Sequence, residues 1–217
     1  MPCDTKSKKV NLVELKKYIN WYGAENVAAI GVSAPNFPNG MMDDIEAASL
    51  IALVNGIPVH VDACMGGFIN MFCEEIKADF QCKGVTSISL DSHKYGMTGK
   101  GSSICVFRKT SEFSPTMEYL NHEAGVYATT GISGSTRGET VLELYAMLTR
   151  LGKDYWVKAA RDIIKTTRDL ATEVDKIPGV KVIGNAAELT CIIAVELDQD
   201  FYKGKKAPNI HAIADEL

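Results

Sequence analysis

The amino-acid sequence predicts an α/β fold built on a mainly parallel sheet. Short apolar runs such as residues 26–32 and 57–63 alternate with amphipathic helical stretches, a pattern typical of strands joined by crossover helices. The chain has 217 residues, of which 46% are hydrophobic and 23% are charged, so it can bury one sizeable core. Ligands of such folds bind outside the carboxyl ends of the strands. Residues at those ends are therefore the first candidates for a functional site.

Helices and strands follow one another along the whole chain. Residues 10–22 and 41–56 each predict an amphipathic helix, and each precedes a predicted strand. The second of these helices has Asp43 and Asp44 in its first turn, where the helix dipole favours negative charge. Further strands are expected at 84–90, 102–108, 179–184 and 189–197, and long amphipathic helices at 139–152 and 154–177.

The organisation of the chain changes near residue 152. The long helices and the strands that follow them resemble the start of a second unit, although no Pro- or Gly-rich linker marks the change. We therefore expect a larger domain over residues 1–152 and a smaller one over residues 153–217. The last element stops soon after it begins, so the smaller domain is expected to be incomplete.

Charge and composition argue against several classes of partner. A formal net charge of -4 provides no basic surface for nucleic acid or an anionic membrane. No apolar run approaches the roughly 20 residues that a membrane-spanning helix needs, so we expect no membrane segment in this chain. The six cysteines are scattered, without a CxxC pair or the histidine spacing of a zinc site. They are typical of reduced cytosolic thiols, and no metal site is expected.

Two strand ends carry the residues with the clearest chemical potential. Asp62 lies at the end of the strand 57–63, and Lys94 follows the strand 84–90 in a glycine-rich loop. A lysine can hold pyridoxal phosphate as a Schiff base, while a carboxylate keeps the ring nitrogen of this cofactor protonated. Taken singly, the lysine is explained by a solvated surface charge and the aspartate by a turn. The pair together favours the cofactor.

Neighbouring residues extend this candidate site. Ala63, Gly66 and Gly67 come after the aspartate, and their small size would leave room for a flat ligand close to the backbone. His93 directly precedes the lysine, and its ring N–H groups suit a phosphate; a structural role explains it equally well. His60 shares a strand face with the aspartate, where a hydrogen-bonded core histidine is the alternative to a site residue.

A second glycine-rich segment precedes the helix predicted at 139–152. Residues 129–138, TTGISGSTRG, gather Gly, Ser and Thr at this point. Backbone N–H groups and hydroxyls in such an arrangement can bind phosphate. A serine-rich helix cap without a ligand explains the same residues, so both interpretations stay open at this stage.

Four blocks of the sequence resemble, in order, blocks of the sphingosine-1-phosphate lyases, pyridoxal-phosphate enzymes related to the group II amino-acid decarboxylases. The blocks are GVSAPNFPNGMMDDIEA at 31–47, IPVHVDACMGGF at 57–68, GVTSISLDSHKYGMTGKGSS at 84–103 and GVYATTGISGS at 125–135. The resemblance runs from about residue 5 to about residue 185. It implies the large domain of the fold type I pyridoxal-phosphate transferases, followed by an incomplete C-terminal small domain.

The resemblance also implies a role for each matching residue. Lys94 would be the Schiff-base lysine, Asp62 the partner of the pyridine nitrogen, and Ala63 a residue that packs against the cofactor ring. His93 would contact the cofactor phosphate. Lys100 matches a second lysine that the family places near the substrate, and it joins Lys94 as a candidate catalytic residue.

A loop shared between two subunits is a further implication. Gly134 and Ser135 match a family loop that reaches the cofactor phosphate of the neighbouring subunit, so a homodimer is implied. In the family an arginine follows directly, whereas Thr136 comes before Arg137 here. The segment between Gly67, in the second block, and Gly84, at the start of the third, is also shorter than is usual in the family.

The activity that the resemblance implies is carbon–carbon cleavage of a phosphorylated sphingoid base. A retro-aldol step would give a fatty aldehyde and phosphoethanolamine, with Lys94 and Lys100 as candidates for proton transfer. Either lysine would then need a pKa well below the ordinary value of about 10.4. The nearest alternative is amino-acid decarboxylation, which uses the same lysine and aspartate.

A third interpretation is that the chain has no activity of its own. Relative to the family, it begins after the region that supplies the rest of the phosphate-binding residues and ends within the small domain. We therefore expect a fragment of the enzyme, for which an inactive truncated product is an alternative. The expected location is cytoplasmic, or the cytosolic face of the endoplasmic reticulum if a longer parent protein carries an upstream anchor.

Overall fold

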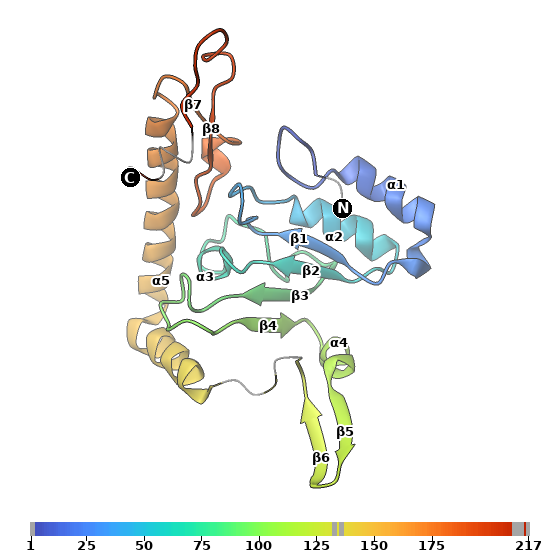
Figure 1. Cartoon of the computed structure of the whole chain (residues 1–217). Helices are drawn as coiled ribbons and strands as arrows, with labels where there is room; N and C mark the ends of the chain where they lie inside the picture. Colours follow the sequence, from blue (N-terminus) through green and yellow to red (C-terminus); the bar gives the residue numbers. More distant parts are fainter. Residues whose placement is uncertain (1–2, 132–133, 135–136, 210–214, 216–217) are drawn as a thin grey trace.

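The computed structural model describes residues 3–131, 134, 137–209 and 215. A four-stranded sheet lies at the centre of the molecule, with the long helix α5 (Gly138–Val174) along one side (Figure 1). The remaining helices are α1 (Leu12–Tyr22), α2 (Ile45–Val54), α3 (Gly67–Asn70) and α4 (Thr110–Phe113), with 3-10 turns at Ala24–Asn26, Ser114–Thr116 and Ala186–Glu188. The strands are β1 (Ile30–Ser33), β2 (Val59–Asp62), β3 (Val85–Leu90), β4 (Ile104–Phe107), β5 (Glu118–His122), β6 (Gly125–Thr129), β7 (Val180–Val182) and β8 (Val195–Leu197).

The predicted α/β fold with a mainly parallel sheet is confirmed. The strand order is β1-β2-β3-β4; the first three strands run parallel, and β4 pairs antiparallel with β3. The register pairs Ser33 with Asp62 and Asp62 with Ser89. Asp62 therefore lies between two serines at the carboxyl edge of the sheet, where ligands of α/β proteins bind.

The helix α2 begins where the sequence indicates, but its two aspartates act differently. Asp44 is the N-cap residue, and its side chain accepts a hydrogen bond from the Ala47 N–H at 2.9 Å. Asp43 precedes the helix instead of lying in its first turn. Its carboxylate accepts hydrogen bonds from the N–H groups of Val10, at 2.7 Å, and Ser33, at 2.8 Å. Asp43 therefore fixes β1 against the N-terminal segment.

The main hydrophobic core lies between the sheet and the helices α1 and α2. Val59, Val61 and Val85 are fully buried at its centre. A close approach of helix to strand completes it, because an added Cβ on Gly84 would come within 2.0 Å of the Ser49 carbonyl oxygen. Only glycine permits this separation of α2 from the start of β3.

The two long helices predicted at 139–152 and 154–177 form one element, α5, with a kink. Gly152 has φ 73° and ψ 167° inside the helix, a conformation open to glycine at little cost. Beyond the kink, Trp156 is 2% exposed and stacks on Phe72 with ring centroids 5.6 Å apart. These contacts hold the second half of α5 against the sheet domain. The division into domains at residue 152 stays a prediction.

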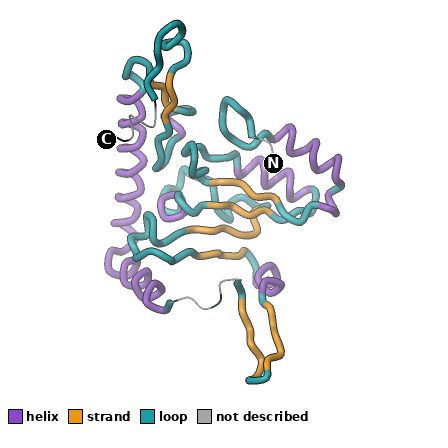
Figure 2. Tube along the Cα trace, in the orientation of Figure 1, coloured by secondary structure: helices purple, strands orange, loops and turns teal. Residues whose placement is uncertain are grey.

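The C-terminal strands are shorter than the sequence predicts. Of residues 179–184 and 189–197, only β7 and β8 are extended, and they pair antiparallel with each other (Figure 2). Met41 joins Ala171, Val182 and Leu189 in a second small core beneath them. The last part of the described chain is thus packed against the N-terminal half.

A β-hairpin that the sequence patterns did not predict projects from the sheet domain. Strands β5 and β6 pair from Glu118 with Thr129 to His122 with Gly125, and side chains on both faces of the hairpin are exposed. Figure 1 shows the hairpin extending away from the sheet.

Within the part of the chain that the structure describes, no helix has both the length and the apolar character needed to cross a bilayer.

Candidate active site

The carboxylate of Asp62 stands at the open edge of the sheet. Asp62 is the last residue of β2 and is exposed, whereas its strand neighbour Val61 is fully buried. Its Oδ1 atom accepts hydrogen bonds from the Cys64 N–H, at 3.1 Å, and from the Ser89 hydroxyl, at 3.4 Å. The strand alternation therefore presents this carboxylate to the ligand-binding edge, as the sequence predicts.

Lys94 lies in the turn that follows β3. The Lys94 N–H donates to the Asp91 carbonyl at 3.3 Å, which closes the turn. Its side chain folds back on the same residue, because Lys94 Nζ lies 2.9 Å from Asp91 Oδ2. Both side chains are largely covered, with 27% and 13% of their surface exposed. The turn thus holds the amine in one place at the sheet edge.

Cys64 connects the lysine to the aspartate of β2. Burial raises the pKa of the Cys64 thiol, hydrogen bonding to Asp62 acts in the same direction, and Lys94 acts to lower it. The two residues that the sequence places at separate strand ends therefore both act on one cysteine.

The electrostatic environment of Lys94 favours the ammonium ion. Burial acts to lower the pKa of its amine, but hydrogen bonds to Asp91 and Cys64 outweigh burial and raise the pKa above the ordinary value. The low pKa that proton transfer requires is therefore not a property of the chain without a cofactor.

The ring of His93 is held by the backbone of the following loop. Its Nδ1 atom is 2.7 Å from the Ser102 carbonyl oxygen, so Nδ1 carries the proton and donates to that oxygen. Nε2 lies 3.8 Å from Asp91 Oδ2. One ring nitrogen is therefore committed to the fold, and only Nε2 is left to meet a phosphate.

His60 is a hydrogen-bonded histidine of the sheet. Nδ1 lies 2.9 Å from the Ser87 hydroxyl and Nε2 lies 3.1 Å from the Ser89 hydroxyl. Burial lowers the pKa of this imidazole, and the Asp62 carboxylate acts to raise it. Because both nitrogens have partners on β3, the structural interpretation of His60 is favoured over a role as a site residue.

The sequence interpretation supposed that the small residues after Asp62 leave room for a ligand. In the structure they pack against the protein instead. An added Cβ on Gly66 would lie 2.3 Å from the Ala34 carbonyl oxygen, and one on Gly67 would lie 2.4 Å from Leu90 Cβ. Ala63 is 2% exposed and belongs to the main core. The protein itself fills this space, and the packing of Ala63 against a cofactor ring stays a prediction.

Two further predicted site residues, Lys100 and Gly134, form no hydrogen bond or ion pair with Lys94 among the described residues. Lys100 is exposed, and its side chain makes no hydrogen bond or ion pair with the residues that the structure describes. Gly134 has φ 70°, and the atom nearest to its Cβ position is the Tyr127 hydroxyl of β6, at 3.8 Å. Ser135 lies outside the described residues.

Two residues of the site were missed by sequence reasoning. Asp91 lies three positions before Lys94 and Cys64 lies two positions after Asp62. These spacings place side chains close together in a turn, which is the signal that could have found them. The local sequence does not show which side chains become buried or which charges meet. The relation of Asp91 and Cys64 to Lys94 is therefore seen only in the folded structure.

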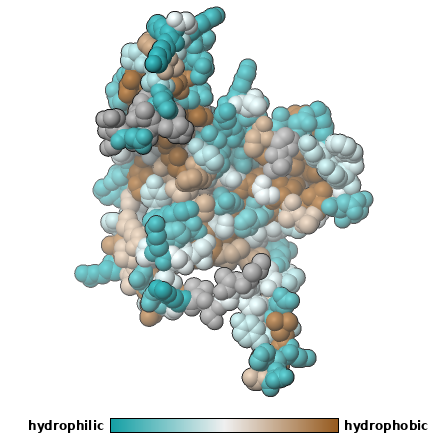
Figure 3. Space-filling model, in the orientation of Figure 1, coloured by the Kyte–Doolittle hydropathy of each residue, from teal (hydrophilic) through white to brown (hydrophobic). Residues whose placement is uncertain are grey.

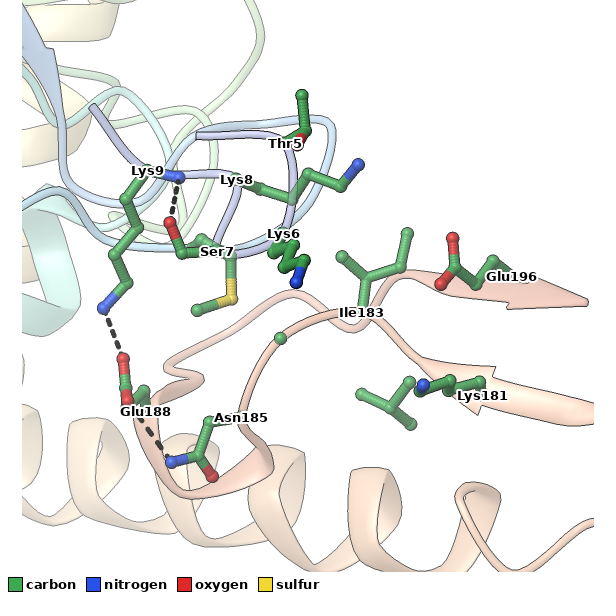
Figure 4. A pocket seen from close by; sticks show the side chains of 13 residues that line it. Thr5, Lys6, Ser7, Lys8, Lys9, Lys181, Ile183, Asn185, Glu188 and Glu196 are labelled. Carbon is green, nitrogen blue, oxygen red and sulfur yellow. Dashed lines mark hydrogen bonds and ion pairs between the residues drawn. The ribbon is translucent and has the colours of Figure 1, made fainter. Parts of the chain in front are cut away.

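A polar cavity of about 720 Å³ lies elsewhere in the molecule, between the N-terminal segment 5–9 and the β7–β8 region. Figure 4 shows the Lys9 amine directed at Glu188, with which it forms an ion pair, while the Asn185 amide bonds the same carboxylate. No predicted site residue lines this cavity. The contacts join the N-terminus to the second half of the chain, and we assign them a structural role.

The residues at the sheet edge fit the two reactive ends of pyridoxal phosphate. The cofactor needs an amine for its aldehyde and a carboxylate for its ring nitrogen. Lys94 Nζ is held at this edge by Asp91, and the Asp62 carboxylate is held there by the Cys64 N–H. Among the described residues, no cluster of histidine, cysteine or acidic side chains could hold a metal ion.

A mainly parallel sheet that presents a lysine and a carboxylate at its carboxyl edge has the arrangement of the α/β proteins that bind pyridoxal phosphate. The chain belongs to the pyridoxal-dependent decarboxylase family, because the model of the pyridoxal-dependent decarboxylase conserved domain matches residues 6–193. This match extends over most of the described elements, from α1 to the segment just before β8.

The chain is similar to proteins named as sphingosine-1-phosphate lyases. It is 36% identical over 207 residues to sphingosine-1-phosphate lyase 1 of Mus musculus, covering 91% of this chain and 35% of that protein. It is 40% identical over 177 residues to a probable sphingosine-1-phosphate lyase of Legionella pneumophila, covering 80% and 29%. The chain thus spans about a third of the length of these relatives.

A solved structure of the same kind shares the fold. The sphingosine-1-phosphate lyase of Burkholderia pseudomallei superposes with a TM-score of 0.81 at 31% sequence identity, over 91% of this chain and 45% of that chain. The arrangement of sheet and helices is therefore the one found in that lyase. The resemblance to this family, predicted from four sequence blocks, is confirmed.

Proposed function

We propose that the chain takes part in pyridoxal-phosphate-dependent cleavage of a carbon–carbon bond in a phosphorylated sphingoid base, which gives a fatty aldehyde and phosphoethanolamine. The observation that carries the proposal is the presence of a lysine amine and a carboxylate at one edge of the sheet, with Lys94 Nζ held 2.9 Å from Asp91 Oδ2 and Asp62 bonded to the Cys64 N–H. Relatives at 36% and 40% identity carry the lyase name, which supports this reaction over others of the family.

Each end of the cofactor would have a partner at the sheet edge. When bound, pyridoxal phosphate supplies an aldehyde for a lysine amine and a protonated ring that accepts an electron pair. Lys94 Nζ would hold the aldehyde carbon once it leaves its ion pair with Asp91. The Asp62 carboxylate would hold a proton at the ring nitrogen. Ala63 would pack beside the ring.

Other residues would act on the phosphate and on the substrate. His93 Nε2 is the ring nitrogen left for the cofactor phosphate, since Nδ1–H donates to the Ser102 carbonyl, and it would donate to that phosphate as an imidazolium with both nitrogens protonated. Lys100 Nζ is exposed near this turn and would move a proton at the substrate. Gly134 and Ser135 would bind the phosphate of a second subunit, because Gly134 meets no residue of the Lys94 turn in its own chain.

A homodimer is therefore part of the proposal. Tyr119 is 65% exposed and Val126 is 71% exposed on the β5–β6 hairpin, and Figure 3 shows hydrophobic surface there. A two-stranded hairpin with both faces in water is marginal on its own, so a partner surface that covers it would stabilise it. We propose a cytosolic setting, in which thiols such as the six cysteines stay reduced.

Amino-acid decarboxylation is the second candidate function. The matching family model is described as a decarboxylase domain, and the same lysine and aspartate would serve. The two reactions differ in the bond that breaks, so a phosphorylated sphingoid base releases a fatty aldehyde whereas an amino acid releases carbon dioxide. Product analysis with each substrate would separate them.

Trapping of the cofactor on Lys94 is the experiment that tests the proposal. The purified chain is mixed with pyridoxal phosphate, reduced with borohydride and digested, and the labelled lysine is identified by mass spectrometry. We expect the label on Lys94, no label there in Lys94→Ala, and full labelling of Lys94 in Lys109→Ala, a matched change at an exposed lysine. Labelling spread over surface lysines would contradict the proposal and leave the inactive alternative.

A further inference from the structure

One carboxylate of the site has no role in the function proposed above. Asp91 is the first residue after β3, and its side chain is 13% exposed. Its Oδ2 atom lies 2.9 Å from Lys94 Nζ and 3.8 Å from His93 Nε2, and the side chains of Ser103 and Lys94 both act to lower the pKa of its carboxyl. Asp91 therefore gathers the donors of the Lys94 turn around one carboxylate.

The backbone fixes where this carboxylate stands. The Asp91 N–H donates to the Cys64 carbonyl at 3.3 Å, and the Asp91 carbonyl accepts from the Lys94 N–H at 3.3 Å. Cys64 belongs to the segment after β2, so Asp91 is tied to two neighbouring strand ends at once. By contrast, the Asp62 carboxylate at the same edge accepts hydrogen bonds from the Cys64 N–H and Ser89, and it forms no ion pair with a described residue.

We propose that Asp91 is a positioning residue that holds the Lys94 amine at the sheet edge as an ammonium ion until an aldehyde-bearing ligand displaces it. The identity of that ligand rests on the proposed function, whereas the ion pair can be tested without any cofactor. Asp91 then governs two properties of Lys94, which are the direction of its side chain and the fraction of its amine that is neutral.

The second property follows from the charges around the amine. The titratable groups that face Lys94 are Asp91 on its own turn, Cys64 on the segment after β2, and Cys191 on the segment before β8. Only the Asp91 carboxylate among them is an anion at neutral pH in its ordinary state, and contact with Lys94 and Ser103 outweighs burial to lower its pKa further. A neutral amine is the nucleophile in reactions with carbonyl carbon, so the ion pair slows such reactions near neutral pH.

Chemical labelling of the cofactor-free chain tests the proposal. The whole chain is treated with a low concentration of acetic anhydride at a series of pH values, and acetylation of Lys94 is followed by mass spectrometry with Lys109 as the internal reference. We expect Asp91→Asn to speed acetylation of Lys94 by about two- to fivefold near pH 8, the effect of removing a partly exposed ion pair, and Asp91→Glu to restore the slower rate in part.

The matched control is Glu143→Gln, which removes a carboxylate that accepts a hydrogen bond from the Gly99 N–H without breaking an ion pair of Lys94, and we expect the Lys94 rate to stay unchanged. An unchanged rate in folded Asp91→Asn would overturn the proposal. If that variant does not fold, Lys94→Met provides the reciprocal measurement, in which the pKa of the Asp91 carboxyl, read by carbon NMR, is expected to rise. A pKa equal to that of the unmodified chain would also overturn it.

Failure of this inference and failure of the proposed function give different results. Acetylation reports on Lys94 with no cofactor present, so a faster rate in Asp91→Asn supports the ion pair even if pyridoxal phosphate never labels Lys94. Conversely, cofactor trapped on Lys94 together with an unchanged acetylation rate would support the function and reject the role of Asp91.

Discussion

At the scale of single residues, the site depends on contacts that side chains make across neighbouring strand ends. The Lys94 amine is committed to Asp91 and Cys64, and the Asp62 carboxylate is held by the Cys64 N–H and Ser89. A cofactor bound to Lys94 would have to replace the contacts of the lysine amine, and it would leave the hydrogen bonds of the Asp62 carboxylate in place. The small residues after Asp62 contribute by packing against protein, which explains why glycine is found there without any ligand.

The burial of His60 leads to a prediction about stability and pH. Because burial lowers the pKa of the folded histidine below its ordinary value of 6.5, the unfolded chain binds a proton at a higher pH than the folded chain does. Stability supplied by this group is therefore fully present above about pH 6.5 and is lost as the pH falls below that value through the lower pKa of the folded protein. We expect His60→Gln, which keeps a polar side chain beside Ser87 and Ser89, to reduce the loss.

Urea unfolding at about pH 7.5 and at about pH 5.5 measures this effect. The decrease in the free energy of unfolding between the two pH values should be smaller in His60→Gln than in the unmodified chain. The exposed His122 provides the control, because His122→Gln should leave the decrease unchanged. Equal decreases in all three proteins would show that His60 does not titrate differently on folding.

At the scale of elements, the approach of α2 to β3 decides whether the sheet edge is formed. Gly84 leads into β3 directly under the Ser49 carbonyl of α2, and the Cβ of an alanine would come within 2.0 Å of that oxygen. Neither the carbonyl nor the strand can move without opening the core around Val85. This short separation therefore requires glycine at position 84.

Gly84→Ala should consequently destabilise the chain by about 2–4 kcal/mol, since backbone atoms must shift in a packed core. Gly31→Ala is the matched control in β1, because nothing lies within 4 Å of its Cβ position. This control should change stability by less than about 0.5 kcal/mol. The free energies of unfolding in urea check both, and a neutral Gly84→Ala would show that α2 tolerates displacement from β3.

At the scale of the whole molecule, two apolar surfaces of the described chain are exposed. The first is the β5–β6 hairpin, on which Tyr119 and Val126 lie on one face by the strand register. The second is the first half of α5, where Leu142 is 69% exposed and Tyr145 is 68% exposed. Residues 130–137 separate the hairpin from this helix in the sequence.

We expect the chain to form a dimer that depends on the hairpin. Changing Tyr119 and Val126 together to serine should weaken self-association by at least about tenfold, because two large apolar side chains are lost from the contact. Trp21→Ser is the control, since Trp21 is 78% exposed on α1, which is part of a different surface. Sedimentation equilibrium measures the dissociation constants. A monomeric unmodified chain, or an unchanged constant in the double variant, would contradict this expectation.

Much of the fold was predictable because its signals are local. Strand-like runs and helical periodicity placed most of the central sheet and the helices α1, α2 and α5, and the strand ends located Asp62 and Lys94. The β5–β6 hairpin escaped because its strands bury neither face, so no alternation of apolar and polar residues marks them. The strand predicted at 189–197 came out short because Leu189 packs in the second core and the chain becomes extended only at Val195.

The sequence by itself determined the α/β class, the family and the identity of the lysine and aspartate at the sheet edge. These depend on residue order, and residue order carries periodicity and motif spacing directly. The tertiary structure alone decided that Asp91 and Cys64 hold Lys94, that one nitrogen of His93 is committed to Ser102, and that protein fills the space beside Gly66 and Gly67. Those outcomes depend on which side chains meet when separate strands pack side by side, and sequence separation does not encode that meeting.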